Sequence, residues 1–110
     1  LENCSLYNLE LNFNFSLFRK LNNINLKYNY ISIIKKSYFE SNSYLTSVDL
    51  GYNLIYLIEY NSFRAVSQIS YLNLNYNRLS YFNQTMISAK TSLKIREIYL
   101  NNNEIIFYSN

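Results

Sequence analysis

The sequence predicts an α/β repeat solenoid, in which every repeat contributes one strand to a parallel β-sheet. One pattern, L-x-x-L-x-L-x-x-N-x-L, occurs four times in step along the 110 residues. Each copy contains a short run in which apolar and polar residues alternate, and this period is typical of a strand with one buried face. Units that recur at a constant spacing stack on their neighbours and share one modular core.

The pattern divides the chain into repeats. Its four complete copies are Leu21–Ile31, Leu45–Ile55, Ile69–Leu79 and Ile95–Ile105. The second strand leucines are spaced by 25, 24, 24 and 26 residues, at Leu1, Leu26, Leu50, Leu74 and Leu100. We therefore predict a single domain with a partial repeat over 1–20, repeats over 21–44, 45–68 and 69–94, and an incomplete last repeat over 95–110. Since no polar cap is recognisable at either end, we expect a fragment of a longer array.

Each repeat is expected to begin with a strand and to return along a less regular segment. The strands are predicted at Ile24–Leu26, Val48–Leu50, Leu72–Leu74 and Ile98–Leu100. The next apolar pairs turn the chain back into the interior: Ile31 with Ile34, Ile55 with Ile58, Leu79 with Phe82, and Ile105 with Tyr108. The return segments are expected to be irregular or to hold a turn or two of helix: Lys35–Tyr44, Tyr60–Gln68 and Asn83–Lys94.

One asparagine follows the strand in every complete copy: Asn29, Asn53, Asn77 and Asn103. The backbone turns there without a neighbouring strand, and a buried amide side chain can accept from an N–H group and donate to a carbonyl. We therefore predict a structural ladder of asparagines, without a binding role. Cys4 holds the same place in the partial repeat, and we assign it to the ladder in preference to a reactive thiol.

This pattern and its spacing resemble the leucine-rich repeat family, whose repeats are about 20–29 residues long. Phe39 and Phe63 follow their strand leucines by 13 residues, as does Ile87. A phenylalanine there resembles the "typical" subclass, with repeats of about 24 residues. The resemblance implies a leucine-rich-repeat arc with the parallel β-sheet on its concave face and irregular or short-helical segments on its convex side. Animal members of that subclass are mostly extracellular, which favours an extracellular or cell-surface location over a cytoplasmic one.

The resemblance also implies a protein-binding module that uses the outward residues of the strands on the concave face. These residues are mainly Tyr and Asn, which suit protein recognition because tyrosine offers broad contact at small entropic cost and asparagine offers adaptable hydrogen bonds. Tyr71 and Tyr99 point outward in the alternation and are the most direct candidates. The predicted ligand-binding residues are Tyr28, Tyr52, Tyr71, Tyr76, Tyr99, Asn25, Asp49, Asn73, Asn75 and Glu97.

Two groups among these residues have competing interpretations. Tyr28, Tyr52 and Tyr76 share one motif position, so their rings are expected to form a column across neighbouring strands. This column either contacts the ligand or stacks internally and shields the edge of the core. Asp49 and Glu97 either attract a basic partner or keep the face soluble.

Composition argues against catalysis and against several classes of partner. The chain has no histidine, so the usual general base and the Ser–His or Cys–His nucleophile pairs are missing. No metal motif or glycine-rich phosphate loop is present, so no enzyme activity, metal or cofactor is predicted. Ten basic and seven acidic residues give a net charge of +3 without a basic run, which argues against nucleic acid. No apolar run is long enough for a membrane span in this segment.

The predicted function is therefore recognition of a protein ligand, and a receptor ectodomain is one setting for such a module. Two alternatives stay open. The first is a structural or self-associating segment that uses the sheet edges. The second is a targeting arm of a larger protein that carries a catalytic domain elsewhere.

Overall fold

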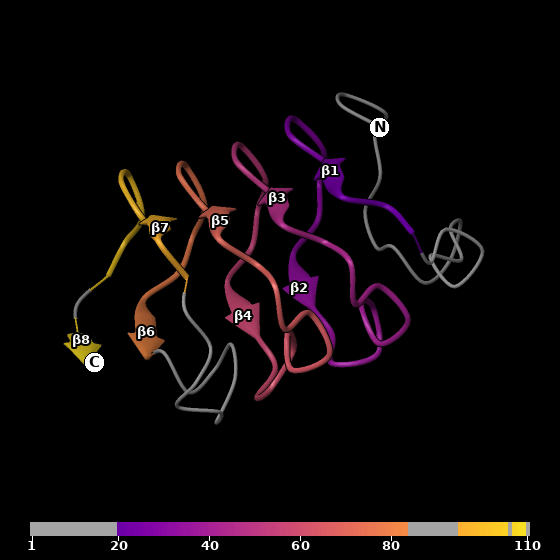
Figure 1. The fold of residues 1–110 in the computed structure, drawn as a ribbon. Helices are drawn as coiled ribbons and strands as arrows, with labels where there is room; N and C mark the ends of the chain where they lie inside the picture. The colour runs from indigo at the N-terminus through magenta and orange to yellow at the C-terminus, as the bar shows by residue number, and fades with distance from the viewer. Residues whose placement is uncertain (1–19, 84–94, 106, 110) are drawn as a thin grey trace.

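A four-stranded parallel sheet is the largest element of the computed structural model, which describes residues 20–83, 95–105 and 107–109. Its strands are β1 (Asn23–Asn25), β3 (Ser47–Asp49), β5 (Tyr71–Asn73) and β7 (Glu97–Tyr99). They follow one another in the order β1-β3-β5-β7, side by side along the molecule (Figure 1). Equivalent motif positions are paired, with Ile24 opposite Val48 and Val48 opposite Leu72. The predicted solenoid, in which each repeat contributes one strand to this parallel sheet, is thus confirmed.

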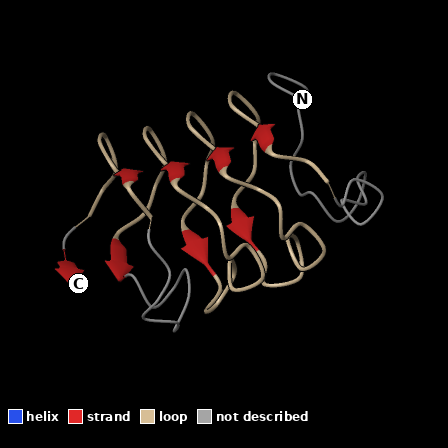
Figure 2. Ribbon diagram, viewed as in Figure 1, coloured by secondary structure: helices blue, strands red, loops and turns tan. Residues whose placement is uncertain are grey.

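A second set of short strands, which we did not predict, follows the first set. It contains β2 (Ile33–Ile34), β4 (Leu57–Ile58), β6 (Tyr81–Asn83) and β8 (Phe107–Ser109). β2 pairs with β4 and β6 with β8, again in parallel, and Figure 2 shows these strands in a second row. Ile34, Ile58 and Phe82 are no more than 2% exposed. Their side chains therefore point into the core from these short strands. β2 and β4 contain two residues each, which is too short to show a strand period.

The return segments consist of turns, and no helix occurs in the residues that the structure describes (Figure 2). Hydrogen bonds between residues three apart hold the first segment. The N–H of Tyr38 donates to the carbonyl of Lys35 at 3.1 Å, and that of Asn42 donates to Phe39 at 3.2 Å. Of the two expected forms, these segments take the irregular one. The third segment lies outside the described residues after Asn83.

The core is a continuous stack of apolar side chains that runs through the repeats. Three strand leucines are fully buried: Leu26, Leu50 and Leu74. Burial of one such side chain contributes about 1.5–3 kcal/mol to folding. Phe39 and Phe63 stack on each other with ring centroids 5.1 Å apart and planes at 18°, at the positions where the resemblance implies a phenylalanine spine. The next spine position, Ile87, lies outside the described residues.

The core is less well covered at β7. Ile98 and Leu100 are half-buried, whereas the equivalent Leu72 and Leu74 have no exposed surface. Among the described residues, β7 has a neighbouring strand on one side only. This edge therefore presents apolar surface beside backbone groups that no described strand covers.

Three of the asparagines assigned to the ladder, Asn53, Asn77 and Asn103, each connect two repeats. The amide of Asn53 donates to the carbonyl of Leu50 in its own repeat and to that of Leu26 in the preceding one, both at 3.0 Å. Its oxygen accepts from the N–H of Ile31 at 3.1 Å. The amide also donates to the carbonyl of Gly51 at 3.1 Å, so a single side chain provides partners for four backbone groups that lie beyond the strands.

The same set of bonds recurs one repeat later. Asn77 donates to Leu74 at 3.1 Å and to Leu50 at 3.0 Å, and accepts from Ile55 at 2.9 Å. Asn29 and Asn77 are buried and Asn103 is half-buried. Cys4, the fifth predicted position, lies outside the described residues.

Candidate functional site

The outward side chains of the main sheet form rows that cross the strands. The strand rows follow from the pairing register and consist of Asn23, Ser47, Tyr71 and Glu97, and of Asn25, Asp49, Asn73 and Tyr99. Two further rows lie at the ends of the strands and consist of Lys27, Gly51, Asn75 and Asn101, and of Tyr28, Tyr52, Tyr76 and Asn102. Every predicted ligand-binding residue lies in one of these rows. All of them are exposed or half-buried.

The row that starts at Asn25 forms part of the turns. The Asn25 side-chain oxygen accepts from the N–H of Lys27 at 3.0 Å, and the Asn73 oxygen accepts from the N–H of Asn75 at 2.9 Å. Asn and Asp commonly hold a turn through a bond to the backbone two residues on. Their oxygens are therefore committed within the protein. The recurrence of Asn or Asp directly before the strand leucine was the sequence signal for this role.

Asp49 belongs to the same row and has the most partners. One of its oxygens accepts from the N–H of Gly51 and from the side-chain amide of Asn73, both at 3.0 Å. The other oxygen lies 3.9 Å from the ammonium of Lys27, and the Asp49 side chain is only 17% exposed. A β-carbon on Gly51 would lie 3.0 Å from the Asn73 amide nitrogen, so glycine leaves room for this cluster. The charge of Asp49 is balanced within the protein, by a lysine that we did not single out from the sequence.

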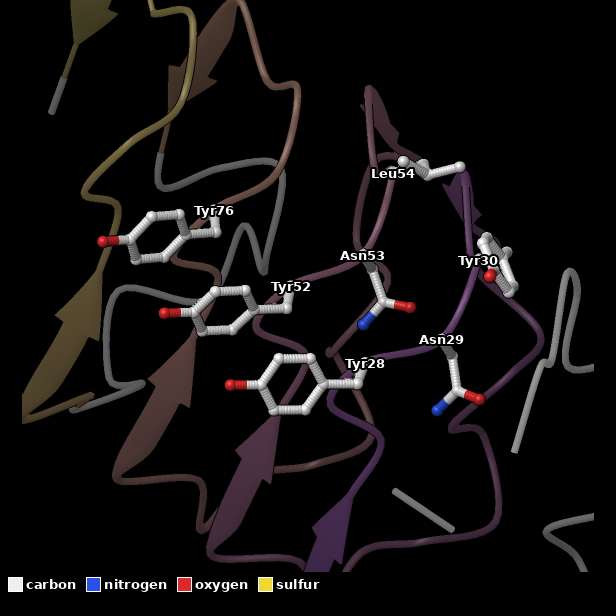
Figure 3. Close-up of a pocket in the computed structure, with 7 residues that line it drawn as sticks. All are labelled: Tyr28, Asn29, Tyr30, Tyr52, Asn53, Leu54 and Tyr76. Atoms are coloured by element: carbon white, nitrogen blue, oxygen red, sulfur yellow. The ribbon is translucent and has the colours of Figure 1, made fainter. Parts of the chain in front are cut away.

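The predicted tyrosine column is present. The ring centroids of Tyr28 and Tyr52 are 4.5 Å apart with planes at 23°, and those of Tyr52 and Tyr76 are 4.3 Å apart with planes at 9°. Figure 3 shows the rings in a row with their hydroxyl groups on the same side and the side chains of Asn29 and Asn53 on the other. The central ring, Tyr52, is stacked on both faces, whereas Tyr28 and Tyr76 each stack on it through one face.

The backbone of the column is left-handed. Tyr28, Tyr52 and Tyr76 have φ angles of 59°, 56° and 59°, and Asn102, at the fourth equivalent position, has 58°. This conformation costs a residue with a β-carbon about 1–2 kcal/mol, and stacking of an aromatic pair offsets about 0.5–1.5 kcal/mol. Asparagine tolerates this conformation better than most residues. The column therefore ends at Tyr76 although the turn itself continues.

A shallow, open hollow of about 390 Å³ lies beside the column. Its lining residues are Tyr28, Asn29, Tyr30, Tyr52, Asn53, Leu54 and Tyr76, all drawn in Figure 3. Two of them are ladder asparagines, and the Asn53 amide already donates to three backbone carbonyls. The hollow therefore offers tyrosine edges and few free hydrogen-bonding groups, which fits a role of the column in shielding the ladder.

Tyr71 and Tyr99 form a different arrangement on β5 and β7. Their ring centroids are 5.5 Å apart and the planes are tilted by 54°, so the two rings are not stacked face to face. The Tyr99 hydroxyl donates to the carboxylate of Glu97. Both side chains are half-buried and Glu97 is exposed. This pair is the part of the sheet face where aromatic surface and a reachable negative charge occur together.

The pKa values of both phenols are raised. The hydrogen bond to Glu97 is the main cause for Tyr99, followed by the charge of Glu97. For Tyr71, burial comes first and the charge of Asp49 second, with Lys27 acting in the opposite direction. Negative charges near both rings therefore disfavour a further negative charge on them.

No group of three or more His, Cys, Asp or Glu side chains that could hold a metal ion occurs in the described part of the chain. Within the same residues, no helix has the length and apolar character needed to cross a membrane.

The chain was compared with known protein families and with curated proteins. A family model described as leucine rich repeat matches residues 19–79, which is more than half of the chain and includes β1 to β5. The comparison with curated proteins gives no match.

Proposed function

Because the chain belongs to the leucine-rich repeat family, whose members generally serve as protein-interaction modules, we propose that it binds a protein ligand through the concave face of its four-stranded sheet. Family members are typically non-enzymatic binding scaffolds, and the proposed function includes no catalytic step. The identity of the ligand does not follow from the family.

The observation that carries the proposal is the uncovered sheet face. A parallel sheet usually has both faces covered. Here the inner face packs on the core through fully buried residues such as Leu72, whereas the outward Tyr71, Asn73, Glu97 and Tyr99 remain exposed or half-buried. A rigid surface of this kind binds without reorganising, which lowers the entropic cost of association.

Within this face, the geometry supports unequal roles for the candidate residues. Tyr71 and Tyr99 offer aromatic surface, and a central tyrosine in an interface often contributes more than 1 kcal/mol to binding. Asn25 and Asn73 have committed oxygens, and one amide N–H of Asn73 is bonded to Asp49, so the remaining amide N–H groups are what they offer to a ligand. Asp49 contributes to binding indirectly, because its hydrogen bonds hold the N–H of Gly51 and the side-chain amide of Asn73 in place.

The test uses the chain as bait for proteins from its own source cells. We expect a partner that wild-type bait binds and that the double variant Tyr71→Ala, Tyr99→Ala loses, with at least a tenfold weaker Kd at about 1.4 kcal/mol per factor of ten. Tyr60→Ala is the matched control, because Tyr60 is 57% exposed beyond β4, outside the sheet face. Equal binding by all three baits would refute the proposal.

One observation favours a second candidate function, which is self-association. The half-buried Ile98 and Leu100 at the β7 edge are apolar surface that another parallel strand would cover. Sedimentation velocity would then show assembly that increases with concentration and is unchanged by Tyr71→Ala or Tyr99→Ala. A single species over a wide concentration range would exclude this role.

The wider setting of the module is a separate part of the proposal. A receptor ectodomain and a targeting arm for a catalytic domain both use an arc of this kind to hold a protein ligand. The sequence of the parent transcript distinguishes them. A leader and a membrane span support the first setting, and a downstream catalytic domain supports the second.

A further inference from the structure

We propose that Tyr71, Tyr99 and Glu97 form a binding site, called here the arginine seat, for the guanidinium group of one arginine side chain. This arginine belongs to the protein bound on the concave face. This inference rests on the proposed function, because it names the chemistry of the partner at that face. It concerns a small part of the sheet, the outward-facing side chains at these positions of β5 and β7. The arguments for it are the ring geometry and the distribution of charge.

The ring geometry leaves aromatic faces available. Tyr71 and Tyr99 are tilted by 54° with centroids 5.5 Å apart, and both are half-buried. A cation is attracted to the face of an aromatic ring within about 6 Å of its centroid. Because the two centroids are only 5.5 Å apart, a single planar cation placed over the pair can lie within about 6 Å of both centroids.

The charge distribution supplies one free acid at this place. Asp49 has three partners, and the Lys27 ammonium 3.9 Å away balances its charge. Glu97 is exposed and accepts from the neutral hydroxyl of Tyr99, and it makes no ion pair with another residue that the structure describes. Lys27–Asp49 is the only ion pair that the structure shows within its described residues. The sheet face therefore has its unbalanced negative charge beside the tilted pair.

The raised pKa values of the two phenols agree with this assignment. Glu97 raises the pKa of Tyr99 by its hydrogen bond and then by its charge. For Tyr71, burial is the first cause, the charges of Asp49 and Glu97 also raise the pKa, and Lys27 acts in the opposite direction. Burial disfavours any charge, so only the part of these shifts that comes from nearby negative charge also favours a cation.

Guanidinium fits better than ammonium for two reasons. It is planar and more weakly hydrated, so it stacks on aromatic faces, and its fork of N–H groups suits a carboxylate. The tyrosine column suits a guanidinium less well. Its central ring, Tyr52, is stacked between Tyr28 and Tyr76 at 4.5 and 4.3 Å, which covers both of its faces, and the residues lining the hollow beside the column include no acid.

The test is an NMR titration of the complete 110-residue chain with labelled tyrosine rings. The probes are N-acetyl-arginine amide, its lysine analogue and its citrulline analogue, which keeps the shape of arginine without the charge. We expect the arginine probe to shift the Tyr71 and Tyr99 ring signals saturably, and to bind about fivefold more weakly to Glu97→Gln. Glu40→Gln is the matched control, since Glu40 is an exposed acid in a return segment, and it should bind as the wild type does.

Three results would each overturn the seat: no shift of these ring signals, equal binding of the lysine or citrulline probe, or unchanged binding by Glu97→Gln. Failure of the proposed function is a separate outcome. If a natural partner binds the double variant Tyr71→Ala, Tyr99→Ala normally, the concave-face assignment fails whatever the probes do. If the double variant loses that partner but Glu97→Gln binds it at full strength, the arginine seat fails alone.

Discussion

Tyr28, Tyr52 and Tyr76 form a column whose rings cover one another, whereas Tyr71 and Tyr99, on the same sheet, form a tilted pair beside an acid. The column residues have left-handed backbones and their centroids are at most 4.5 Å apart. The pair lies on strands, with its centroids 5.5 Å apart. The position of a tyrosine relative to the strand leucine therefore decides whether its ring stabilises the repeat or is available to a ligand.

The physical reason is the direction of the side chain. In a strand, successive side chains alternate between the two faces, so Tyr71 and Tyr99 point away from the core. Two residues beyond the strand leucine, the positive φ of Tyr52 changes that direction. Its ring is then placed over the turn, where equivalent rings from neighbouring repeats are close enough to stack.

The largest expected effect is on the ladder beside the column. Asn53→Ala removes four hydrogen bonds to backbone groups and should lower the free energy of unfolding by about 2–3 kcal/mol, because buried polar groups lose their partners. Asn73→Ala, at a half-buried position with two bonds, should lower it by about 1 kcal/mol. Urea unfolding measures both. Equal, near-zero effects would contradict the ladder assignment.

The next effect tests the column itself. Tyr52→Ala removes two stacked contacts and should lower the free energy of unfolding by about 2 kcal/mol. Tyr52→Gly should be less damaging by about 1 kcal/mol, because glycine accepts a positive φ without strain. Tyr71→Ala, which loses one tilted contact, should change stability by less than either.

Thermal and urea unfolding of the three variants measure this order. A Tyr52→Gly protein that is less stable than Tyr52→Ala would show that backbone strain at this turn is unimportant. A Tyr71→Ala protein that is less stable than both would show that the tilted pair, and not the column, stabilises the repeat.

The fold was largely predictable from the sequence because the repeat has a constant length. Equal spacing places equivalent residues of neighbouring repeats side by side. The order and parallel pairing of the strands therefore follow from the positions of Leu26, Leu50 and Leu74. β2 and β4 were not predictable in this way. Their apolar residues were identified, but two residues carry no period from which a strand can be inferred.

The site was less predictable, because its side chains have partners in other repeats. The alternation shows that Asp49 and Glu97 face outward, and says nothing of what they contact. Asp49 bonds to Asn73 in the next repeat, and Glu97 bonds to Tyr99 in its own strand. The left-handed turn at Tyr52 was hidden as well, because tyrosine is not a residue that signals positive φ.

A smaller effect separates the two acids. Asp49→Asn removes an ion pair and weakens two hydrogen bonds at a side chain that is only 17% exposed, so it should lower the free energy of unfolding by about 1 kcal/mol. Glu97→Gln, at an exposed position, should leave stability unchanged and should weaken arginine binding instead. Urea unfolding and the probe titration together measure both outcomes. Similar stability losses in the two variants would contradict the separation.

The smallest effect concerns the tilted pair and alkaline pH. A phenol whose pKa is raised in the folded protein stabilises it at pH values below the unfolded pKa of about 10, and this contribution is lost as the pH rises through the folded pKa. Glu97→Gln removes the first-named cause of the raised pKa of Tyr99, so the Tyr99 ring should titrate closer to the ordinary tyrosine value. NMR titration of the labelled rings measures it, against the ordinary tyrosine pKa of about 10. If the Tyr99 ring of the wild type already titrates at that ordinary value, Glu97 does not hold the Tyr99 hydroxyl proton in solution, and the tilted pair loses the acid that distinguishes it from the column.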